Sequence, residues 1–159
     1  MLKIFKMNPI DCEEKLKQFI KDNNVQAKHI HFSTSVHTVE EAAREANAEP
    51  DDFVKSICMI GEQAIVAIVL GTDRASIERV GKVVGKRPHV ASPEEALIAT
   101  GYPVGGTPPF GYDAIFIVDE SVLSKDIVYA GGGSPQALIR ISPQEILRIN
   151  SAKIARVRK

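Results

Sequence analysis

The 159-residue chain carries 20 basic and 20 acidic residues, so its formal net charge is zero at pH 7. Its length fits one domain, which we place over 1–159, and a composition of 44% hydrophobic and 25% charged residues is typical of a soluble globular protein. Bulk electrostatics therefore neither demands nor excludes a nucleic-acid partner, and only local patches could carry that signal.

Neither of the two cysteines, Cys12 and Cys58, belongs to a CxxC or His/Cys cluster, which argues against a structural zinc site. We expect both thiols to be reduced and buried, and we expect neither a metal nor a cofactor. The N-terminal stretch 1–17 lacks the long apolar core of a signal peptide, and the longest apolar run, 64–70, is too short to span a membrane. The sequence therefore predicts a cytoplasmic protein.

The first third of the chain predicts two helices around a short strand. Residues 8–24 read as a helix with an asparagine able to cap it and a proline in the first turn. Residues 27–32 alternate like a strand. A helix over 38–48 follows, and Thr38 with Glu41 forms a capping box at its start.

The middle of the chain predicts a hairpin followed by two helices. Two β-rich runs, 52–61 and 63–71, are separated by a Gly-Glu-Gln turn. An amphipathic helix over 72–85, a short strand over 89–91 and a helix over 92–101 complete this part, the last helix beginning with a second capping box.

Strands are predicted over 113–120, 126–130 and 137–141, followed by a helix over 142–150 with a third capping box, Ser142 with Glu145. Strands and helices mix without strict alternation, and several strand pairs have short connections. An α/β (α+β) fold, a mixed sheet surrounded by helices, therefore fits better than a doubly wound parallel sheet.

The stretch GYPVGGTPPFG, 101–111, concentrates glycine and proline in one connection. Glycines let a backbone approach a ligand closely, and prolines make the loop rigid. Gly105, Gly106 and Thr107 keep N–H groups that could face a phosphate, a carboxylate or a developing oxyanion. The alternative is an ordinary tight turn between a helix and a strand.

Lys55 lies inside an apolar strand, on the face that Phe53, Ile57 and Met59 share. Such a lysine either extends its ammonium past a sheet edge into water or serves as a cation in a pocket. His29 and His31 share a strand face but lack a third metal ligand. His37 precedes a helix, where it caps, faces water or contacts a pocket.

Three segments in this order resemble the YbaK family: FVKSICMIG with Lys55, the run 91–111, and VYAGGG followed by ALIRISPQEIL. These proteins are free-standing relatives of the editing domain of bacterial prolyl-tRNA synthetases. The resemblance covers roughly 30–155. It implies a partly closed mixed sheet wrapped by helices and hydrolysis of tRNAs that carry the wrong amino acid.

The family's essential lysine corresponds to Lys55 and its GxxxP loop to 105–109. The resemblance thus implies that Lys55 anchors the substrate while Gly105, Gly106 and Thr107 act as oxyanion donors. The residues expected to bind substrate are His37, Pro109, Gly111, Gly131 and Gly132.

Two departures from the family pattern concern the amino-acid pocket. Pro108 occupies a usual serine position, and Gly131 replaces a serine that many members carry. Specificity therefore does not transfer from the best-known members, and Ala, Ser, Cys and Thr are the candidate misacylated residues.

The expected partner is the acceptor end of an aminoacyl-tRNA, and the resemblance allows a contact with an aminoacyl-tRNA synthetase. Basic stretches over 79–89 and 148–159 contain no acidic residue and could hold phosphates or simply face solvent. Two alternatives stay open: a non-catalytic module that binds charged tRNA or a nucleotide, and a hydrolase for another ester. Oligomeric state has no signal in the sequence.

Overall fold

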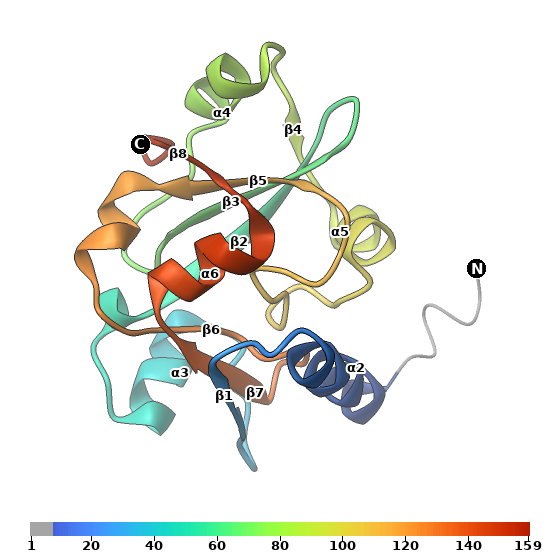
Figure 1. Ribbon diagram of the computed structural model, residues 1–159, viewed down its shortest axis with the longest axis vertical. Coiled ribbons are helices and arrows are strands. Elements are labelled where there is room, and N and C mark those ends of the chain that lie inside the picture. The colour runs from blue at the N-terminus through green and yellow to red at the C-terminus, as the bar shows by residue number, and fades with distance from the viewer. Residues whose placement is uncertain (1–7) are drawn as a thin grey trace.

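Residues 8–159 are described by a computed structural model, which has two β-sheets surrounded by helices (Figure 1). The expected absence of a signal peptide falls partly on residues 1–7, which lie outside the described residues. Within 8–159, no helix is long and apolar enough to cross a membrane.

The larger sheet occupies the upper half of Figure 1 and is mixed. Its order is β4 (His89–Val90), β2 (Val54–Ile60), β3 (Ala64–Leu70), β5 (Ile115–Asp119) and β8 (Lys153–Ala155). The predicted hairpin forms its centre as the antiparallel pair β2 and β3, and β5 joins β3 in parallel. At the edges, β4 is antiparallel to β2 and β8 is parallel to β5.

The smaller sheet is antiparallel, in the order β1 (Ala27–His31), β7 (Ala137–Ile141) and β6 (Val128–Gly131). Phe53, just ahead of β2, bridges Tyr129 of β6, and the centroids of the two rings lie 5.1 Å apart. The two sheets therefore meet along one side, which confirms the partly closed mixed architecture expected from the sequence.

Helices cover both sheets, and most of them begin where the sequence predicts. They are α2 (Pro9–Asp22), α3 (Val39–Ala46), α4 (Ile77–Val84), α5 (Pro93–Thr100) and α6 (Pro143–Asn150), with 3-10 turns η1 (Pro50–Asp52) and η2 (Glu120–Ser124). The side chain of Asn8 caps α2, and complete capping boxes start at Thr38 and Ser92. In Figure 1, α2 and α3 flank the smaller sheet, and α4 and α5 flank the larger.

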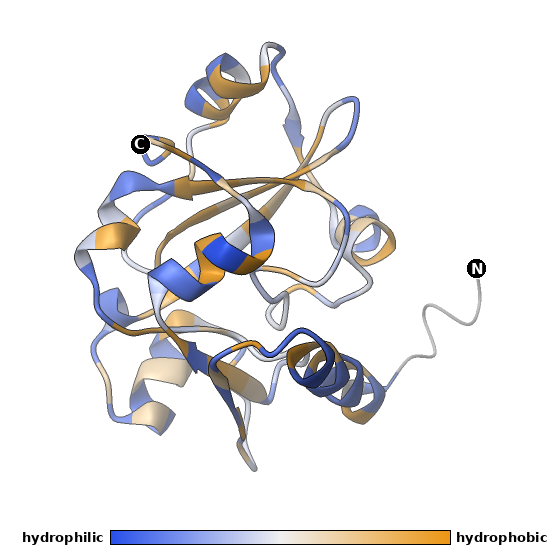
Figure 2. Cartoon of the chain, viewed as in Figure 1, coloured by the Kyte–Doolittle hydropathy of each residue, from blue (hydrophilic) through white to orange (hydrophobic). Residues whose placement is uncertain are grey.

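The central strand β3 is buried on both faces, which explains its continuous apolar run. Val66 belongs to a core cluster with Leu16 of α2, whereas Ala67 belongs to a second cluster with Val80 of α4. Figure 2 shows this strand and its neighbours as the hydrophobic centre of the fold. Cys12 and Cys58 are buried and unbonded, as expected.

The helix expected over 72–85 begins only at Ile77, because the preceding residues pair with the end of the chain. Ser76 caps the helix with its side chain, while its N–H donates to the carbonyl of Val157 at 2.6 Å. Ala75 bridges Arg158. The C-terminal segment, expected only as a basic tail, also contributes strand β8.

The third expected capping box is incomplete. Ser142 accepts the N–H of Glu145 at 3.1 Å, but the carboxylate of Glu145 turns away from the cap. It accepts the N–H of Gln26 at 2.6 Å and the guanidinium of Arg148 at 2.7 Å instead. A tertiary hydrogen bond to the backbone of Gln26 and a local ion pair with Arg148 have replaced the reciprocal bond of the box.

Candidate functional site

A pocket of about 450 Å³ opens where β2, β6, the start of α3 and the loop after α5 converge. Five of the residues expected from the sequence line it: His37, Lys55, Gly105, Thr107 and Gly131. The sequence did not identify its largely apolar walls, which include Val36, Phe53, Val54, Ala96, Tyr129 and Leu138. Small-molecule binding sites are usually lined in this way, by apolar side chains with a few polar groups among them.

Lys55 enters the pocket wall from the start of β2, where β2 pairs with β3 but not with β4, and is half-buried. Its Nζ donates a hydrogen bond to the carbonyl oxygen of Asp73. Burial lowers the pKa of Lys55, and the nearby Arg74 lowers it further, while Asp73 and Glu40 oppose the shift. The lysine is thus a partly desolvated cation rather than a side chain extended freely into water.

Of the three N–H groups expected from the sequence to face a ligand, two have no acceptor in the described part of the chain. Within residues 8–159, neither the N–H of Gly105 nor that of Thr107 donates to a hydrogen-bond acceptor. By contrast, the N–H of Gly106 donates to the carbonyl of Pro103 at 3.1 Å. Of the three expected oxyanion donors, Gly105 and Thr107 therefore keep an N–H group that a ligand can use.

The two glycine-rich segments of the sequence pack directly on each other. A Cβ on Gly131 would lie 2.2 Å from the carbonyl oxygen of Thr107, and a Cβ on Gly106 would lie 2.6 Å from the backbone of Ser134. The N–H of Gly133 also donates to the carbonyl of Gly106 at 2.8 Å. Close backbone approach is the reason for glycine here.

Four expected site residues do not line the pocket: Gly106, Pro109 and Gly111 of the loop, and Gly132 of the segment packed against it. The carbonyl of Pro109 accepts from Asn150 at 2.9 Å. Gly111 takes a positive φ of +98°. The N–H of Gly132 donates to the carbonyl of Ala137 at 3.0 Å.

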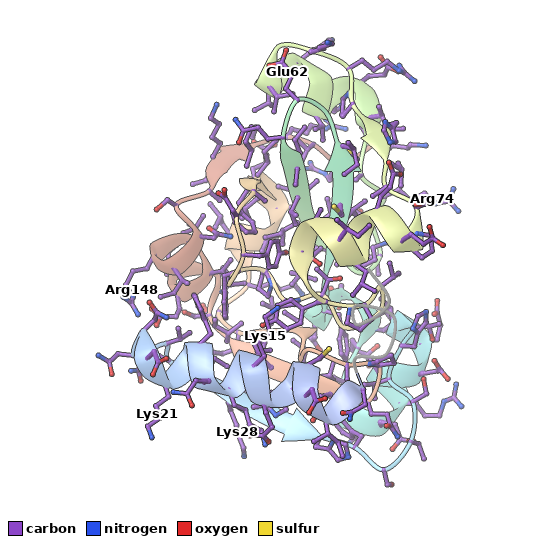
Figure 3. The ribbon with its side chains drawn as sticks, turned by 90° about the vertical axis from the view of Figure 1, so that its right-hand side faces the viewer. Lys15, Lys21, Lys28, Glu62, Arg74 and Arg148 are labelled. Atoms are coloured by element: carbon purple, nitrogen blue, oxygen red, sulfur yellow. The ribbon has the colours of Figure 1, made fainter. Side chains whose placement is uncertain are left out.

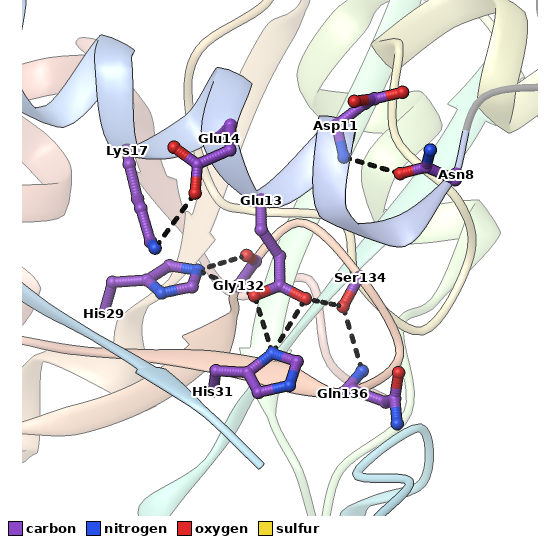
Figure 4. Close-up of polar contacts among 10 residues, drawn as sticks. All are labelled: Asn8, Asp11, Glu13, Glu14, Lys17, His29, His31, Gly132, Ser134 and Gln136. Carbon is purple, nitrogen blue, oxygen red and sulfur yellow. Dashed lines mark hydrogen bonds and ion pairs between the residues drawn. The ribbon is translucent and has the colours of Figure 1, made fainter. Parts of the chain in front are cut away.

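Residues 131–134, which pack against the Gly/Pro loop, are held by a buried carboxylate that the sequence did not indicate. Glu13 of α2 is 4% exposed, and it accepts hydrogen bonds from the Ser134 hydroxyl at 2.7 Å and from Nδ1 of His31 at 2.9 Å (Figure 4). Nε2 of His29 lies 2.8 Å from the carbonyl oxygen of Gly132. Burial lowers the pKa of His29 despite that contact.

These contacts give His29 and His31 a structural role beside Glu13. Among residues 8–159, no three His, Cys, Asp or Glu side chains are grouped so that they could hold a metal ion. His37 lies elsewhere, against the loop: a Cβ on Gly105 would be 2.1 Å from its Nδ1.

Replacement of Glu13 by Gln should lower the free energy of unfolding by about 1–3 kcal/mol, because one buried donor would lose its acceptor. The measurement is urea unfolding at pH 7. Glu14→Gln is the matched control, since Glu14 is exposed and, among residues 8–159, pairs only with Lys17; it should change stability by less than about 0.5 kcal/mol. Equal unfolding curves for the two variants would remove Glu13 as a support of the loop.

Among known protein families, residues 33–149 match the aminoacyl-tRNA editing domain. The protein YwhH of Bacillus subtilis (strain 168) is 29% identical over 130 residues, which is 79% of this chain and 80% of that protein. A structure described as a proposed trans-editing enzyme for prolyl tRNA synthetase shares 29% identity with a TM-score of 0.88, covering 96% of this chain and 99% of that one. Hypothetical protein APE2540 is also 29% identical, with a TM-score of 0.85 over 91% of this chain and 99% of its own.

Proposed function

Because the chain belongs to the family of aminoacyl-tRNA editing domains, we propose that it is a hydrolase that removes the amino acid from mischarged tRNA. The observation that carries this proposal is the pocket itself, which combines the half-buried cation of Lys55 with the open N–H groups of Gly105 and Thr107. A cation and paired backbone donors suit an ester whose carbonyl oxygen becomes negative during hydrolysis.

In the proposed reaction, a water oxygen adds to the ester carbonyl carbon, and the resulting oxyanion accepts hydrogen bonds from Gly105 and Thr107. Each such donor is worth roughly 3 kcal/mol of transition-state stabilisation. The oxyanion then re-forms the carbonyl as the ester bond breaks, and the departing ribose oxygen takes up the proton that the attacking water gives up. Lys55 holds the carbonyl or the neighbouring phosphate as a point charge, and the free hydroxyl of the terminal ribose orients the water.

The pocket also offers a polar group toward the aminoacyl moiety. Oγ of Ser56 is buried and has no hydrogen-bond partner among the described residues, and Ser56 lines the pocket together with Cys58 and Ala96. A buried hydroxyl without a hydrogen-bond partner favours a ligand that supplies such a partner. The α-ammonium of any candidate, or the side-chain hydroxyl of Ser or Thr, would serve.

The test is deacylation of tRNAs charged with Ala, Ser, Cys or Thr, each on several tRNA identities, with spontaneous hydrolysis subtracted. We expect rapid loss of one aminoacyl group. Binding of tRNA without turnover would replace the proposal by a non-catalytic module. Equal turnover of simple aminoacyl esters and aminoacyl-tRNA would point to a hydrolase for another ester.

Gly105→Ala should reduce kcat/KM by about 100-fold, because a displaced oxyanion donor costs that order of rate. Gly105 has a φ of +89°, and a Cβ there would collide with His37, so the loop or the ring must move. Gly85→Ala is the matched control, since Gly85 has the same φ with nothing within 4 Å of its added Cβ. It should lose about 1 kcal/mol of stability at unchanged activity. Equal activities of the two variants would contradict the role of the loop.

A further inference from the structure

Lys55 stands between the pocket described above and a second cavity of about 410 Å³. Both cavities are lined by Lys55, Ile57 and Val90. Ser56 and Cys58 also line the first cavity, whereas Met59 lines the second. Met59 lies on the same face of β2 as Lys55. The two cavities are therefore neighbours that share the lysine as part of their common wall.

The second cavity is lined by cations. Besides Lys55, it is bordered by Arg74, Arg87 and Lys159, and Glu78 is the one acidic side chain of its lining within residues 8–159. Glu78 is paired with Arg87. Arg74 has no ion-pair partner in the described part of the chain, and Figure 3 shows it projecting outward at the periphery of the molecule. Its charge is thus available to an anion.

The segment that carries Arg74 is held in place by the main chain of the C-terminal residues. The N–H of Lys159 donates to the carbonyl of Arg74 at 2.8 Å, and the N–H of Ser76 donates to Val157 at 2.6 Å. Helix α4 starts directly after Ser76, so its first N–H groups border the same cavity and add positive potential.

Among the described residues, the lining contains no aromatic ring on which a base could stack, so its chemistry suits a phosphate group rather than a nucleobase. We propose that the second cavity binds a backbone phosphate of the same substrate whose ester occupies the first pocket. This inference rests on the proposed function. The phosphodiester next to the terminal adenosine is the phosphate that adjoining cavities can accommodate together with the ester, and Lys55 would lie between the two groups.

Arg74→Ala tests this assignment on two substrates, an aminoacyl-tRNA and an aminoacyl-adenosine that has no phosphate. We expect KM for the tRNA to rise about tenfold, with kcat/KM for the adenosine ester unchanged. One fewer phosphate contact should reduce the slope of log kcat/KM against log salt by about 0.7 for a single strand. Arg74→Lys should restore much of the loss, and thermal unfolding confirms that each variant is folded.

Arg44→Ala is the matched control, because Arg44 is an exposed arginine on α3 that lines neither cavity. It should leave the salt slope unchanged. Equal losses of Arg74→Ala on both substrates would overturn the proposal, since Arg74 would then act on the ester. No loss on either substrate would overturn it as well. If submillimolar inorganic phosphate inhibits the reaction while Arg74→Ala leaves KM for the tRNA unchanged, the cavity is assigned to free phosphate instead.

Equilibrium binding of uncharged tRNA, followed by fluorescence anisotropy, separates this inference from the proposed function. It requires no hydrolysis. Weaker binding and a shallower salt slope for Arg74→Ala would support the phosphate site even if the wild-type protein hydrolysed none of the esters. Unchanged binding, in a protein that does hydrolyse aminoacyl-tRNA, would refute the site and leave the activity standing.

Discussion

Lys55→Ala is expected to reduce kcat/KM for aminoacyl-tRNA hydrolysis by about 10²–10³-fold, the loss typical of removing one preorganised electrostatic group from an active site. The reason is the position of Lys55 in the wall of the ester pocket, where partial burial strengthens the field of its charge. Single-turnover deacylation measures the effect without interference from product release.

Stability measurements show whether that loss is functional. The lowered pKa of Lys55 means that folding disfavours its protonated form, and this penalty is fully present below the folded-state pKa and is relieved as the pH rises above it. The hydrogen bond to Asp73 offsets part of the penalty. We therefore expect Lys55→Ala to change the free energy of unfolding by no more than about 1 kcal/mol.

Lys55→Arg keeps the charge in a planar, bulkier group and should recover only part of the activity. A Lys55→Ala protein that retains wild-type rates would eliminate the lysine from the mechanism. A variant that is inactive because it is unfolded would instead identify Lys55 as structural.

Asp119→Asn is expected to cost about 3 kcal/mol of stability, the lower end of the range for breaking a buried ion pair, because its partner Arg158 is partly exposed. The carboxylate of Asp119 is fully buried at the end of β5. It accepts the N–H groups of Val157 at 2.8 Å and Arg158 at 3.0 Å, and the Arg158 guanidinium at 2.9 Å. An amide cannot accept this many donors.

Glu120→Gln is the matched control for Asp119→Asn. Glu120 lies 3.7 Å from the same guanidinium but is 57% exposed, so its loss should cost less than about 1 kcal/mol. The measurement is urea unfolding of both variants at pH 7. Equal midpoints would show that the C-terminal segment is not anchored by the buried carboxylate.

The pH dependence of stability offers a second view of Asp119. Burial alone would raise its pKa, but hydrogen bonds from Ser121 and from the N–H groups of Val157 and Arg158 lower the pKa to about 2. The stabilisation is therefore complete above the ordinary value near 4 and is lost as the pH falls from about 4 to about 2. Glu145, whose pKa is also lowered to about 2, mainly through Arg148, contributes in the same range.

Between pH 4 and pH 2, the wild-type protein should thus lose stability more steeply than Asp119→Asn. The difference between the two curves isolates Asp119, because Glu145 is present in both proteins. Parallel curves would mean that Asp119 ionises equally easily in the folded and unfolded chains.

Helix starts were predictable because capping is a local interaction. Thr38 and Ser92 each exchange hydrogen bonds with a glutamate three residues later, and the structure has both boxes. The Ser142 box failed for a different reason. The carboxylate of Glu145 meets the N–H of Gln26, which is 119 residues away in the sequence and leaves no trace near position 142.

The features of the candidate site also fall into those that the local sequence identified and those that only tertiary contacts placed. The sequence by itself determined which residue types could do chemistry: a lysine within an apolar strand and a loop of glycines and prolines are locally anomalous, and both line the pocket. The turn in which the N–H of Gly106 donates to Pro103, three residues earlier, is local, and the N–H groups of Gly105 and Thr107 have no acceptor among residues 8–159. Only the tertiary structure decided that Gly131 packs on the carbonyl of Thr107 and that His37 lies against Gly105.

The supports of the site were likewise decided by tertiary contacts. Glu13 reaches Ser134 across 121 residues, and Arg74 borders the second cavity because the chain near residue 159 pairs with its backbone. Hydrophobic periodicity, helix capping and local composition depend on a few neighbouring residues, so they specify helices and strands and mark unusual side chains. Hydrogen bonds between distant segments form only after the sheets pack, and they determine which of the marked groups face a ligand.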